Sequence, residues 1–528
     1  MKKQIKPDLI LILDFGSQYT QLIARRTREM DVYSEIQPYS VDLRKYFELK
    51  KDYSVKGIIL SGGPSSVLDA NAPVLTDSNF RFILSLGIPV LGICYGLQYL
   101  VYKNGGKVHK SGISEYGFTR IKINKSVKLF SGCGKELVVW MSHGDSVDRL
   151  PVQFIKTSES SNRIISSLEN GGKKIYALQF HPEVHHTEKG NVILENFLFR
   201  ICKITNLFKP AEFIASKIDE IRITAGKEYV LCALSGGVDS SVAAVLVHKA
   251  LGKKLICVHI DNGMMRKNES AEIIKIFKEH FKFNLIFVDA ADLFLKRLKG
   301  VTDPERKRKI IGKTFIDVFE KEAIRLKNKG INIKYLVQGT LYPDVIESVS
   351  LKGPSVTIKS HHNVGGLPAK MNLKLIEPFR ELFKDEVRKV GRDLNLPEQF
   401  IKRHPFPGPG LAVRVIGSPD KSKLDLLRNV DDIFINSLHK FRLYDKIWQA
   451  FAVLLPVQSV GVMGDERSYE NVIALRAVNS VDGMTADFFH FPKEFLTYVS
   501  NKIINSVRGV NRVVYDISSK PPATIEWE

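Results

Sequence analysis

The stretch Tyr229–Ser241, which reads YVLCALSGGVDSS, decides the fold of the chain around it. Its apolar run, Val230–Leu234, breaks at two glycines and is followed by DSS at 239–241 and an Ala/Val-rich segment. This order predicts a buried parallel strand, a glycine turn and the N-terminus of a helix. Glycine lets the backbone approach a polyanion closely, and the free N–H groups at a helix start carry the positive end of its dipole. The turn therefore predicts an anion-binding site.

The loop SGGVDSS differs from the P-loop of kinase-like NTPases, because the Gly-Lys-Ser/Thr ending is missing. It resembles instead the pyrophosphate loop of the ATP pyrophosphatases, which split ATP into AMP and pyrophosphate. An ordinary strand-to-helix turn is the alternative, but a strand and a helix both flank the motif and favour the phosphate site. The resemblance implies these ATP-binding residues: Ser235, Gly236, Gly237, Val238, Asp239, Ser240 and Ser241.

Length and composition indicate a globular protein of several domains. The chain has 528 residues, of which 44% are hydrophobic and 26% charged. No apolar run approaches the roughly 18 residues needed to cross a bilayer, and Asp14 interrupts the N-terminal apolar run where a secretory signal would be cleaved. The five cysteines lack metal-type or disulfide-framework spacing. We therefore expect a cytoplasmic protein with no membrane partner.

The formal net charge of +21 is compatible with a nucleic-acid partner. However, the lysines are dispersed along the chain and are not gathered on one segment. This distribution favours anionic small-molecule substrates, and a nucleic-acid partner is the less favoured alternative.

In the first predicted domain, residues 1–205, strands alternate with helices, which indicates a doubly wound parallel sheet. The strand at 89–93 ends in GICYGLQ, which has the Gly-x-nucleophile-x-Gly form of a nucleophile elbow. The helix that follows favours a reactive thiolate at Cys94, whereas the other cysteines are interpreted as inert core residues. A later strand, at 175–180, delivers QFHPEV. With the elbow in the same sheet, His181 and Glu183 complete a predicted Cys–His–Glu triad.

The segments GICYGLQ and QFHPEV together resemble the class I glutamine amidotransferases over residues 1–205. The resemblance implies that Cys94 forms a glutamyl thioester, with His181 as the base and Glu183 as the residue that orients it. It also implies an oxyanion hole and glutamine pocket that contain Gly62, Tyr95 (through its backbone N–H), Gln98 and His143.

The second predicted domain, residues 206–402, is also a doubly wound parallel sheet, with ligands at the carboxyl ends of its strands. Asp261 follows one strand and either accepts from an adenosine ribose, the favoured interpretation, or caps a turn. Asp239 and Asp344 are the candidates for holding Mg²⁺ with ATP.

The segment KSHHNVGGLP at 359–368 combines basic residues with two glycines. The glycines predict a mobile lid that closes over charged ligands and carries Lys359, His361 and His362. The two histidines are adjacent and lack a second ligand pair, so zinc is not expected.

The third predicted domain, residues 403–528, has a mixed αβ pattern, with strands expected at Ile447–Leu454 and Val472–Val478. Its size and apolar strands are compatible with an interface module. Six segments, spread along the chain from the pyrophosphate loop to the C-terminus, resemble segments of the glutamine-hydrolysing GMP synthase family, and the resemblance covers the whole chain. They are SGGVDSS, QGTLYPDVIES, KSHHNVGGLP, RHPFPGPGLAVR, PVQSVGVMGDERSY and KPPATIEWE.

That resemblance implies a C–N forming ligase with a smaller α+β dimerisation domain at its C-terminus and a homodimeric assembly. Its substrates would be XMP, ATP and glutamine, with Mg²⁺ accompanying ATP and no organic prosthetic group. Glutamine hydrolysis would supply ammonia that aminates XMP at C2 through an adenyl-XMP intermediate, which yields GMP, AMP, pyrophosphate and glutamate. By positional match, the XMP-binding residues are Arg308, Arg403, Gln458, Lys520 and Glu526.

A tRNA-modifying adenylating enzyme of the pyrophosphate-loop class is the alternative enzyme, and the basic charge would suit it. The fused glutaminase triad argues against it, as does the absence of a Cys-x-x-Cys pair from the sequence. A non-enzymatic binding module is the second alternative.

Overall fold

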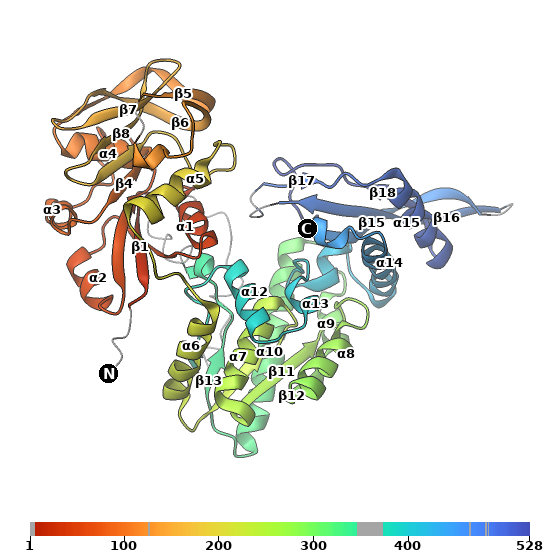
Figure 1. Ribbon diagram of the computed structural model, residues 1–528. Helices are drawn as coiled ribbons and strands as arrows, with labels where there is room; N and C mark the ends of the chain where they lie inside the picture. Colours follow the sequence, from red (N-terminus) through yellow and green to blue (C-terminus); the bar gives the residue numbers. More distant parts are fainter. Residues whose placement is uncertain (1–5, 125–126, 346–372, 464–465, 481–482, 484) are drawn as a thin grey trace. The chain divides into compact units, whose positions relative to one another are not determined.

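The computed structural model describes residues 6–124, 127–345, 373–463, 466–480, 483 and 485–528 (Figure 1). Among these residues, the chain up to Phe213 forms one compact unit and the chain from Ile214 onward forms a second. The predicted division at 205/206 lies near this boundary, and the predicted division at 402/403 lies inside the second unit.

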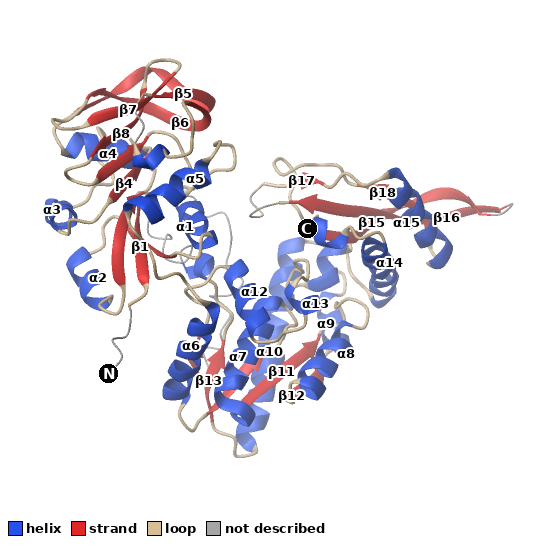
Figure 2. Ribbon diagram, in the orientation of Figure 1, coloured by secondary structure: helices blue, strands red, loops and turns tan. Residues whose placement is uncertain are grey.

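The first unit is built on one mixed sheet, with strand order β2-β1-β3-β4-β9-β8-β7-β5-β6 (Figure 2). The first five strands in this order pair in parallel, which confirms the predicted parallel sheet. From β9 to β6 the pairing is antiparallel. The strands are β1 (Asp8–Asp14), β2 (Tyr33–Pro38), β3 (Ser54–Leu60), β4 (Val90–Ile93), β5 (Lys107–Ile123), β6 (Glu136–Arg149), β7 (Ile155–Ser160), β8 (Ile165–Asn170) and β9 (Ile175–Leu178).

Helices cover the parallel half because its central strands are apolar on both faces. In β1, every residue from Leu9 to Leu13 is fully buried, and Leu9, Leu11 and Leu13 pack in one core with Leu97 and Tyr99. The helices of this unit are α1 (Thr20–Glu29), α2 (Leu43–Leu49), α3 (Asp77–Ser85), α4 (Tyr95–Lys103) and α5 (Gly190–Glu195).

The second unit contains a fully parallel sheet, with strand order β12-β11-β10-β13-β14. Its strands are β10 (Tyr229–Ala233), β11 (Leu255–Asp261), β12 (Asn284–Asp289), β13 (Ile333–Val337) and β14 (Lys374–Ile376). Its helices are α6 (Pro210–Ala225), which crosses the boundary between the units, α7 (Val238–Leu251), α8 (Glu269–Ile274), α9 (Ala291–Leu298), α10 (Pro304–Asn328), α12 (Lys384–Asp393) and α13 (Glu398–Ile401).

The same unit continues into a second sheet, in which β15, β16 and β17 are antiparallel and β18 pairs with β16 in parallel. Apolar residues of both sheets and of the helices between them, among them Leu231, Phe434 and Ile473, form one continuous core. The strands β15 and β16 extend well beyond the predicted strands. The elements are β15 (Gln449–Met463), β16 (Glu466–Asn479), β17 (Asp487–Phe488), β18 (Val510–Tyr515), α14 (Lys421–Lys440) and α15 (Lys493–Ser506).

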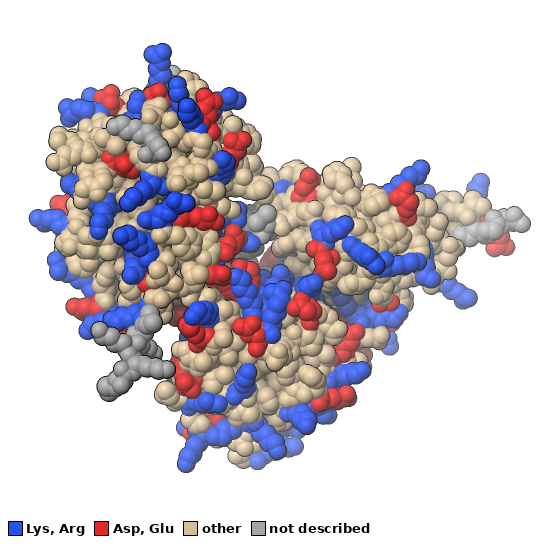
Figure 3. All heavy atoms as spheres, in the orientation of Figure 1, with Lys and Arg blue, Asp and Glu red and all other residues tan. Residues whose placement is uncertain are grey.

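On the face drawn in Figure 3, the basic side chains are scattered among acidic ones, as the dispersed lysines of the sequence indicate. Within the described ranges, none of the helices combines the length and the apolar character that a bilayer crossing requires.

Candidate functional site

Cys94 lies in the turn between β4 and α4, at the edge where the parallel strands end. Its φ of 52° and ψ of −104° are strained for a residue that carries a Cβ. The backbone N–H of Cys94 donates to the Leu178 carbonyl at 2.7 Å, which ties the turn to the neighbouring strand β9. The sulfur is thus held at the end of the sheet by strained backbone, as a nucleophile elbow requires.

The two glycines of the elbow are required by close packing. A Cβ on Gly92 would lie 2.6 Å from the Gly96 carbonyl carbon, and a Cβ on Gly96 would lie 2.4 Å from the Leu60 carbonyl oxygen. These contacts are with backbone atoms, which cannot rotate away. The first turn of α4 therefore packs directly on the end of β3 only because both positions lack a side chain.

His181 and Glu183 follow β9 and meet the elbow. The Nδ1 atom of His181 lies 2.7 Å from Oε1 of Glu183, and the two side chains are 3% and 0% exposed. Burial lowers the pKa of His181, but the charge of Glu183 and the hydrogen bond to Cys94 outweigh it and raise that pKa well above its ordinary value. The structure therefore brings the three predicted triad residues together, with the imidazole oriented by the carboxylate.

Gly62 and Tyr95 lie beside the triad. A Cβ on Gly62 would contact Cε1 of His181 at 3.2 Å, so this glycine borders the imidazole ring. The hydroxyl of Tyr95 donates to the Pro73 carbonyl at 2.7 Å and the ring is buried, so its backbone is the part of this residue that adjoins Cys94.

Gln98 and His143 are buried and bound to other protein groups. Nε2 of Gln98 donates to the Asp145 carbonyl at 3.0 Å. Nδ1 of His143 lies 3.0 Å from the same carbonyl, and its Nε2 lies 3.2 Å from Oε2 of Glu115. Burial raises the pKa of Glu115, but hydrogen bonds from His143 and two polar neighbours outweigh it and lower that pKa. Glu115 was missed from the sequence, because only the antiparallel register of β5 and β6 places it opposite His143.

The pyrophosphate loop joins β10 to α7 in the predicted geometry. Gly236 has φ +78°, and a Cβ there would lie 2.3 Å from Cδ1 of Ile273. Gly237 caps the N-terminus of α7. The hydroxyls of Ser235 and Ser240 lie 2.9 Å apart, which holds the two sides of the loop together. The loop residues Val238 and Ser241 are buried in the first turn of α7.

Asp239 lies in the first turn of α7 and is close to Asp344. Burial raises the pKa of Asp239 most, the charges of Lys384 and Arg388 lower it, and the charge of Asp344 raises it. One oxygen of Asp239, Oδ1, is buried and has no hydrogen-bond partner among the described residues. One oxygen of Asp344 accepts from the Leu341 N–H at 3.0 Å. Two neighbouring carboxylates with an unpaired buried oxygen fit the ligand set of a hard divalent cation.

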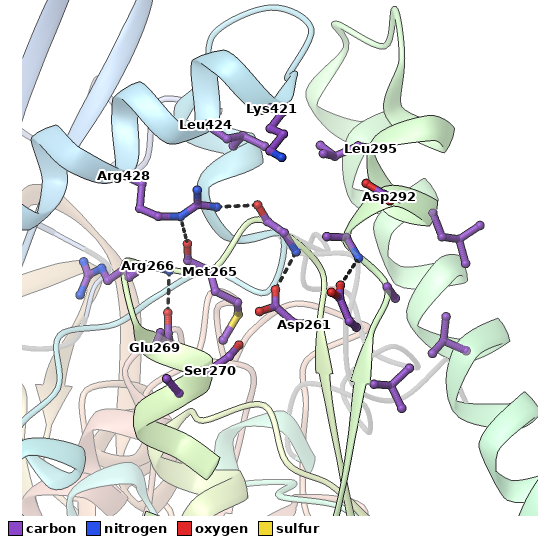
Figure 4. Close-up of a pocket in the computed structure, with 18 of the residues that line it drawn as sticks. Asp261, Met265, Arg266, Glu269, Ser270, Asp292, Leu295, Lys421, Leu424 and Arg428 are labelled. Carbon is purple, nitrogen blue, oxygen red and sulfur yellow. Dashed lines mark hydrogen bonds between the residues drawn. The ribbon is translucent and has the colours of Figure 1, made fainter. Parts of the chain in front are cut away.

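Asp261 ends β11 and lines a cavity of about 940 Å³ (Figure 4). Its carboxylate accepts from the Gly263 N–H at 2.8 Å, so it caps the turn that follows the strand. Among the residues that the structure describes, the lining comes from the ends of β11 and β12, from the loop between β11 and α8, and from α8, α9, α10 and α14. It includes none of the residues 235–241. The pyrophosphate loop is therefore not part of the wall of this cavity.

Known proteins match this chain across both sites, the glutaminase-type triad and the pyrophosphate loop. Residues 11–201 match the family model described as glutamine amidotransferase class-I, residues 209–311 match NAD synthase, and residues 436–527 match the GMP synthase C terminal domain. The chain is 54% identical over 521 residues to the glutamine-hydrolysing GMP synthase of Brachyspira hyodysenteriae, which covers 99% of both chains. It is 58% identical to that of Pelodictyon phaeoclathratiforme over 526 residues, 98% of this chain and 99% of the relative. The chain belongs to the glutamine-hydrolysing GMP synthase family.

Among the residues that the GMP synthase resemblance implies for XMP, Arg403 lies beside the pyrophosphate loop. It donates to the Gly236 carbonyl at 3.0 Å and forms an ion pair with Glu269, which lines the cavity. Burial, reinforced by the charge of Arg266, lowers the pKa of Arg403 to about 10.

Arg308 on α10 and Glu526 in the C-terminal tail both have hydrogen-bond partners in the structure. Arg308 donates to the main-chain oxygen of Glu528. The carboxylate of Glu526 accepts from Arg414 at 2.9 Å and from Gln449 at 2.6 Å. The tail is held further by Lys307, which is buried and bonded to the Glu528 carboxylate. Lys307 and Arg414 were missed, because in the sequence they are indistinguishable from the surrounding basic residues.

Gln458 lies in the C-terminal sheet, and Lys520 lies outside its strands, in an isolated bridge with Ala486. Gln458 is exposed on β15, just after the register shift in its pairing with β16. Nζ of Lys520 donates to the Gly483 carbonyl at 2.8 Å. Within the described ranges, the hydrogen bonds and ion pairs of Arg308 and Arg403 are made with other residues. The predicted lid residues Lys359, His361 and His362 lie outside the described residues.

Proposed function

We propose that this chain is a GMP synthase, which couples glutamine hydrolysis at Cys94 to the amination of XMP in its second unit. The observation that carries the proposal is the presence of two built sites in one chain. These are a buried Cys–His–Glu arrangement and a pyrophosphate loop on a parallel sheet. The similarity to glutamine-hydrolysing GMP synthases over nearly the whole chain supports the pairing.

In the glutaminase, the proton of Cys94 passes to Nε2 of His181, because Nδ1 is occupied by Glu183. The sulfur then attacks the side-chain amide carbon of glutamine, and backbone N–H groups of Gly62 and Tyr95 stabilise the oxyanion. His181 returns the proton to the leaving nitrogen, so ammonia departs and a glutamyl thioester remains. Water hydrolyses the thioester to glutamate.

In the synthetase, the O2 oxygen of XMP attacks the α-phosphorus of ATP, and pyrophosphate leaves onto the loop at 235–241. The free N–H groups at the start of α7 bind the departing charge. AMP is then a good leaving group at C2, where ammonia adds to give GMP. Asp239 and Asp344 would hold Mg²⁺, which neutralises phosphate charge when bound.

Nucleotide recognition is proposed for Arg308, Arg403, Gln458, Lys520 and Glu526, with Asp261 directed to ATP. Arginine and lysine suit the phosphate of XMP, and glutamine and glutamate suit the purine edge. The predicted lid with Lys359, His361 and His362 is kept as part of this proposal. In this structure Arg308 is bonded to Glu528 and Glu526 is bonded to Arg414. XMP would therefore either replace these partners or bind in addition to them.

A homodimer through the C-terminal region is also proposed. The outer parts of β15 and β16 expose Val460, Val462 and Tyr469, with 57%, 74% and 66% of their surfaces accessible. Apolar residues on an extended pair of strands suit burial against a second copy of the chain. All five cysteines are buried thiols, which supports the proposed cytoplasmic location.

The proposal is tested with purified protein supplied with XMP, MgATP and either glutamine or ammonium. GMP, AMP and pyrophosphate should form in equal amounts with both nitrogen sources. Cys94→Ala should abolish only the glutamine-driven reaction, because the two sites are separate. Release of ADP and orthophosphate in place of AMP and pyrophosphate would contradict the proposal. A tRNA-modifying activity is not favoured, because both the glutaminase and the GMP synthase C-terminal family models match this chain.

A further inference from the structure

The sulfur of Cys94 has polar neighbours besides His181. Sγ lies 3.5 Å from the carbonyl oxygen of Ser142 on β6. A carbonyl oxygen can only accept, so it favours the protonated thiol and opposes negative charge on the sulfur. The thiolate therefore needs a donor on another side.

Gln179 supplies such a donor. It directly follows β9, is completely buried, and its Nε2 lies 3.8 Å from the Cys94 sulfur. Its backbone is fixed as well, because its N–H donates to the Ser166 carbonyl at 2.8 Å. The side chain carries no charge, so its effect on the sulfur comes from the direction of its amide dipole.

That direction is set by Gln98. Nε2 of Gln98 lies 3.5 Å from Oε1 of Gln179, so the oxygen of Gln179 accepts and its NH₂ group is turned toward the sulfur. Gln98 is itself fixed by its 3.0 Å bond to the Asp145 carbonyl. The same carbonyl lies 3.0 Å from His143, which meets the carboxylate of Glu115. A continuous run of hydrogen bonds thus holds the amide of Gln179 in one orientation.

We propose that Gln179 is a further catalytic residue of the glutaminase, which donates a hydrogen bond to the Cys94 sulfur and stabilises the thiolate. The inference rests on the proposed role of Cys94 as the nucleophile. In the step concerned, the proton leaves Sγ for Nε2 of His181 and the electron pair stays on sulfur. The amide N–H of Gln179 stabilises that charge until the sulfur bonds to the glutamine carbon. Gln98 is the positioning residue that orients this amide.

Several titratable groups lie around the Cys94 sulfur, and the variants used in the test retain all of them. They are the His181–Glu183 pair, the pair of His143 on β6 and Glu115 on β5, Asp145 on β6 with its buried Oδ2, and Tyr19, whose ring packs 4.9 Å from that of His181. Replacing Gln179 removes none of these groups. Methionine matches the length of glutamine and lacks the donor, so Gln179→Met removes the hydrogen bond with little change in volume.

The experiment measures the rate of Cys94 alkylation by iodoacetamide against pH in the full chain, with the modified peptide quantified by mass spectrometry. For Gln179→Met, the midpoint of the pH profile should rise by about one unit, a tenfold loss of thiolate below the midpoint. Gln179→Glu should raise it further, since a carboxylate would face the sulfur. Glutamine hydrolysis should fall about tenfold in kcat with little change in KM.

The control is Gln37→Met, at a partly exposed glutamine near the end of β2 in the same unit, which should leave the profile unchanged. Gln98→Met should raise the midpoint by less than Gln179→Met does. If Gln179→Met fails to fold, Gln98→Met is the variant that tests the inference. An unchanged midpoint in either folded variant overturns the inference. Such a result, combined with loss of glutamine hydrolysis in Cys94→Ala, would leave the proposed function intact, whereas hydrolysis surviving in Cys94→Ala would overturn both.

Discussion

The elbow glycine Gly96 allows a quantitative test of how the glutaminase is built. In Gly96→Ala, the new Cβ would lie 2.4 Å from the Leu60 carbonyl oxygen, 2.9 Å from the Leu60 Cβ and 3.0 Å from its carbonyl carbon. These atoms belong to β3, which pairs with β4 on one side and with β1 on the other. Since β3 is fixed by both neighbours, the first turn of α4 must move.

The size of the displacement follows from the contact. Ordinary van der Waals contact begins near 3.4 Å, so α4 and β3 must separate by about 1 Å. That movement also strains the 3.1 Å bond from the Gly96 N–H to the Ser61 carbonyl, next to the proposed oxyanion hole. A misplacement of this size costs about 100-fold in rate. Forcing a methyl group into a filled site costs about 1–3 kcal/mol of unfolding free energy.

The assay compares glutamate release with ammonium-driven GMP formation in the same preparation. Glutamate release should fall about 100-fold, whereas ammonium-driven synthesis should stay normal, because Gly96 belongs to the first unit. The matched control is Gly171→Ala, at a glycine of the same unit whose Cβ would meet nothing within 4 Å. Glutamate release by Gly96→Ala within twofold of wild type would refute the packing argument.

Three further predictions concern buried charges. Glu183→Gln should lower glutamine hydrolysis roughly 10⁴-fold. Burial lowers the pKa of His181, but the charge of Glu183 outweighs burial, and the net pKa in the folded state is raised. Protonation of His181 therefore stabilises the fold. This stabilisation is complete below about pH 6.5, the ordinary pKa of histidine, and it is lost as the pH rises through the folded-state pKa. Wild type and Glu183→Gln should therefore differ more in urea unfolding at pH 5 than at pH 9. Asp239→Asn should lower synthesis more than about 100-fold with either nitrogen source. Because burial raises the Asp239 pKa, this variant should gain unfolding free energy at pH 8 and lose that gain on acidification. Lys307→Met leaves the buried Glu528 carboxylate without its cationic partner, so it should cost about 3–5 kcal/mol in urea unfolding and speed hydrogen exchange in the tail.

The strand-turn-helix units were predictable because each is local. The strand predicted at 89–93 and the apolar run at Val230–Leu234 correspond to β4 (Val90–Ile93) and β10 (Tyr229–Ala233), since hydrophobic periodicity and turn residues are properties of adjacent positions. The strand predicted at Ile447–Leu454 was too short. The outer half of β15 mixes exposed polar and apolar residues, so no periodic pattern distinguishes it from a loop.

The sequence by itself determined the candidate residues of the two sites, because the elbow and the pyrophosphate loop are short segments that are recognised by their local pattern of residues. Only the tertiary structure decided which side chains support them. Gln179 faces the Cys94 sulfur because β9 lies beside β4, and Glu115 meets His143 because β5 and β6 pair in one register. Lys307 meets Glu528 across more than two hundred residues of chain. Such partners depend on strand order, register and burial, which arise only when distant segments pack together.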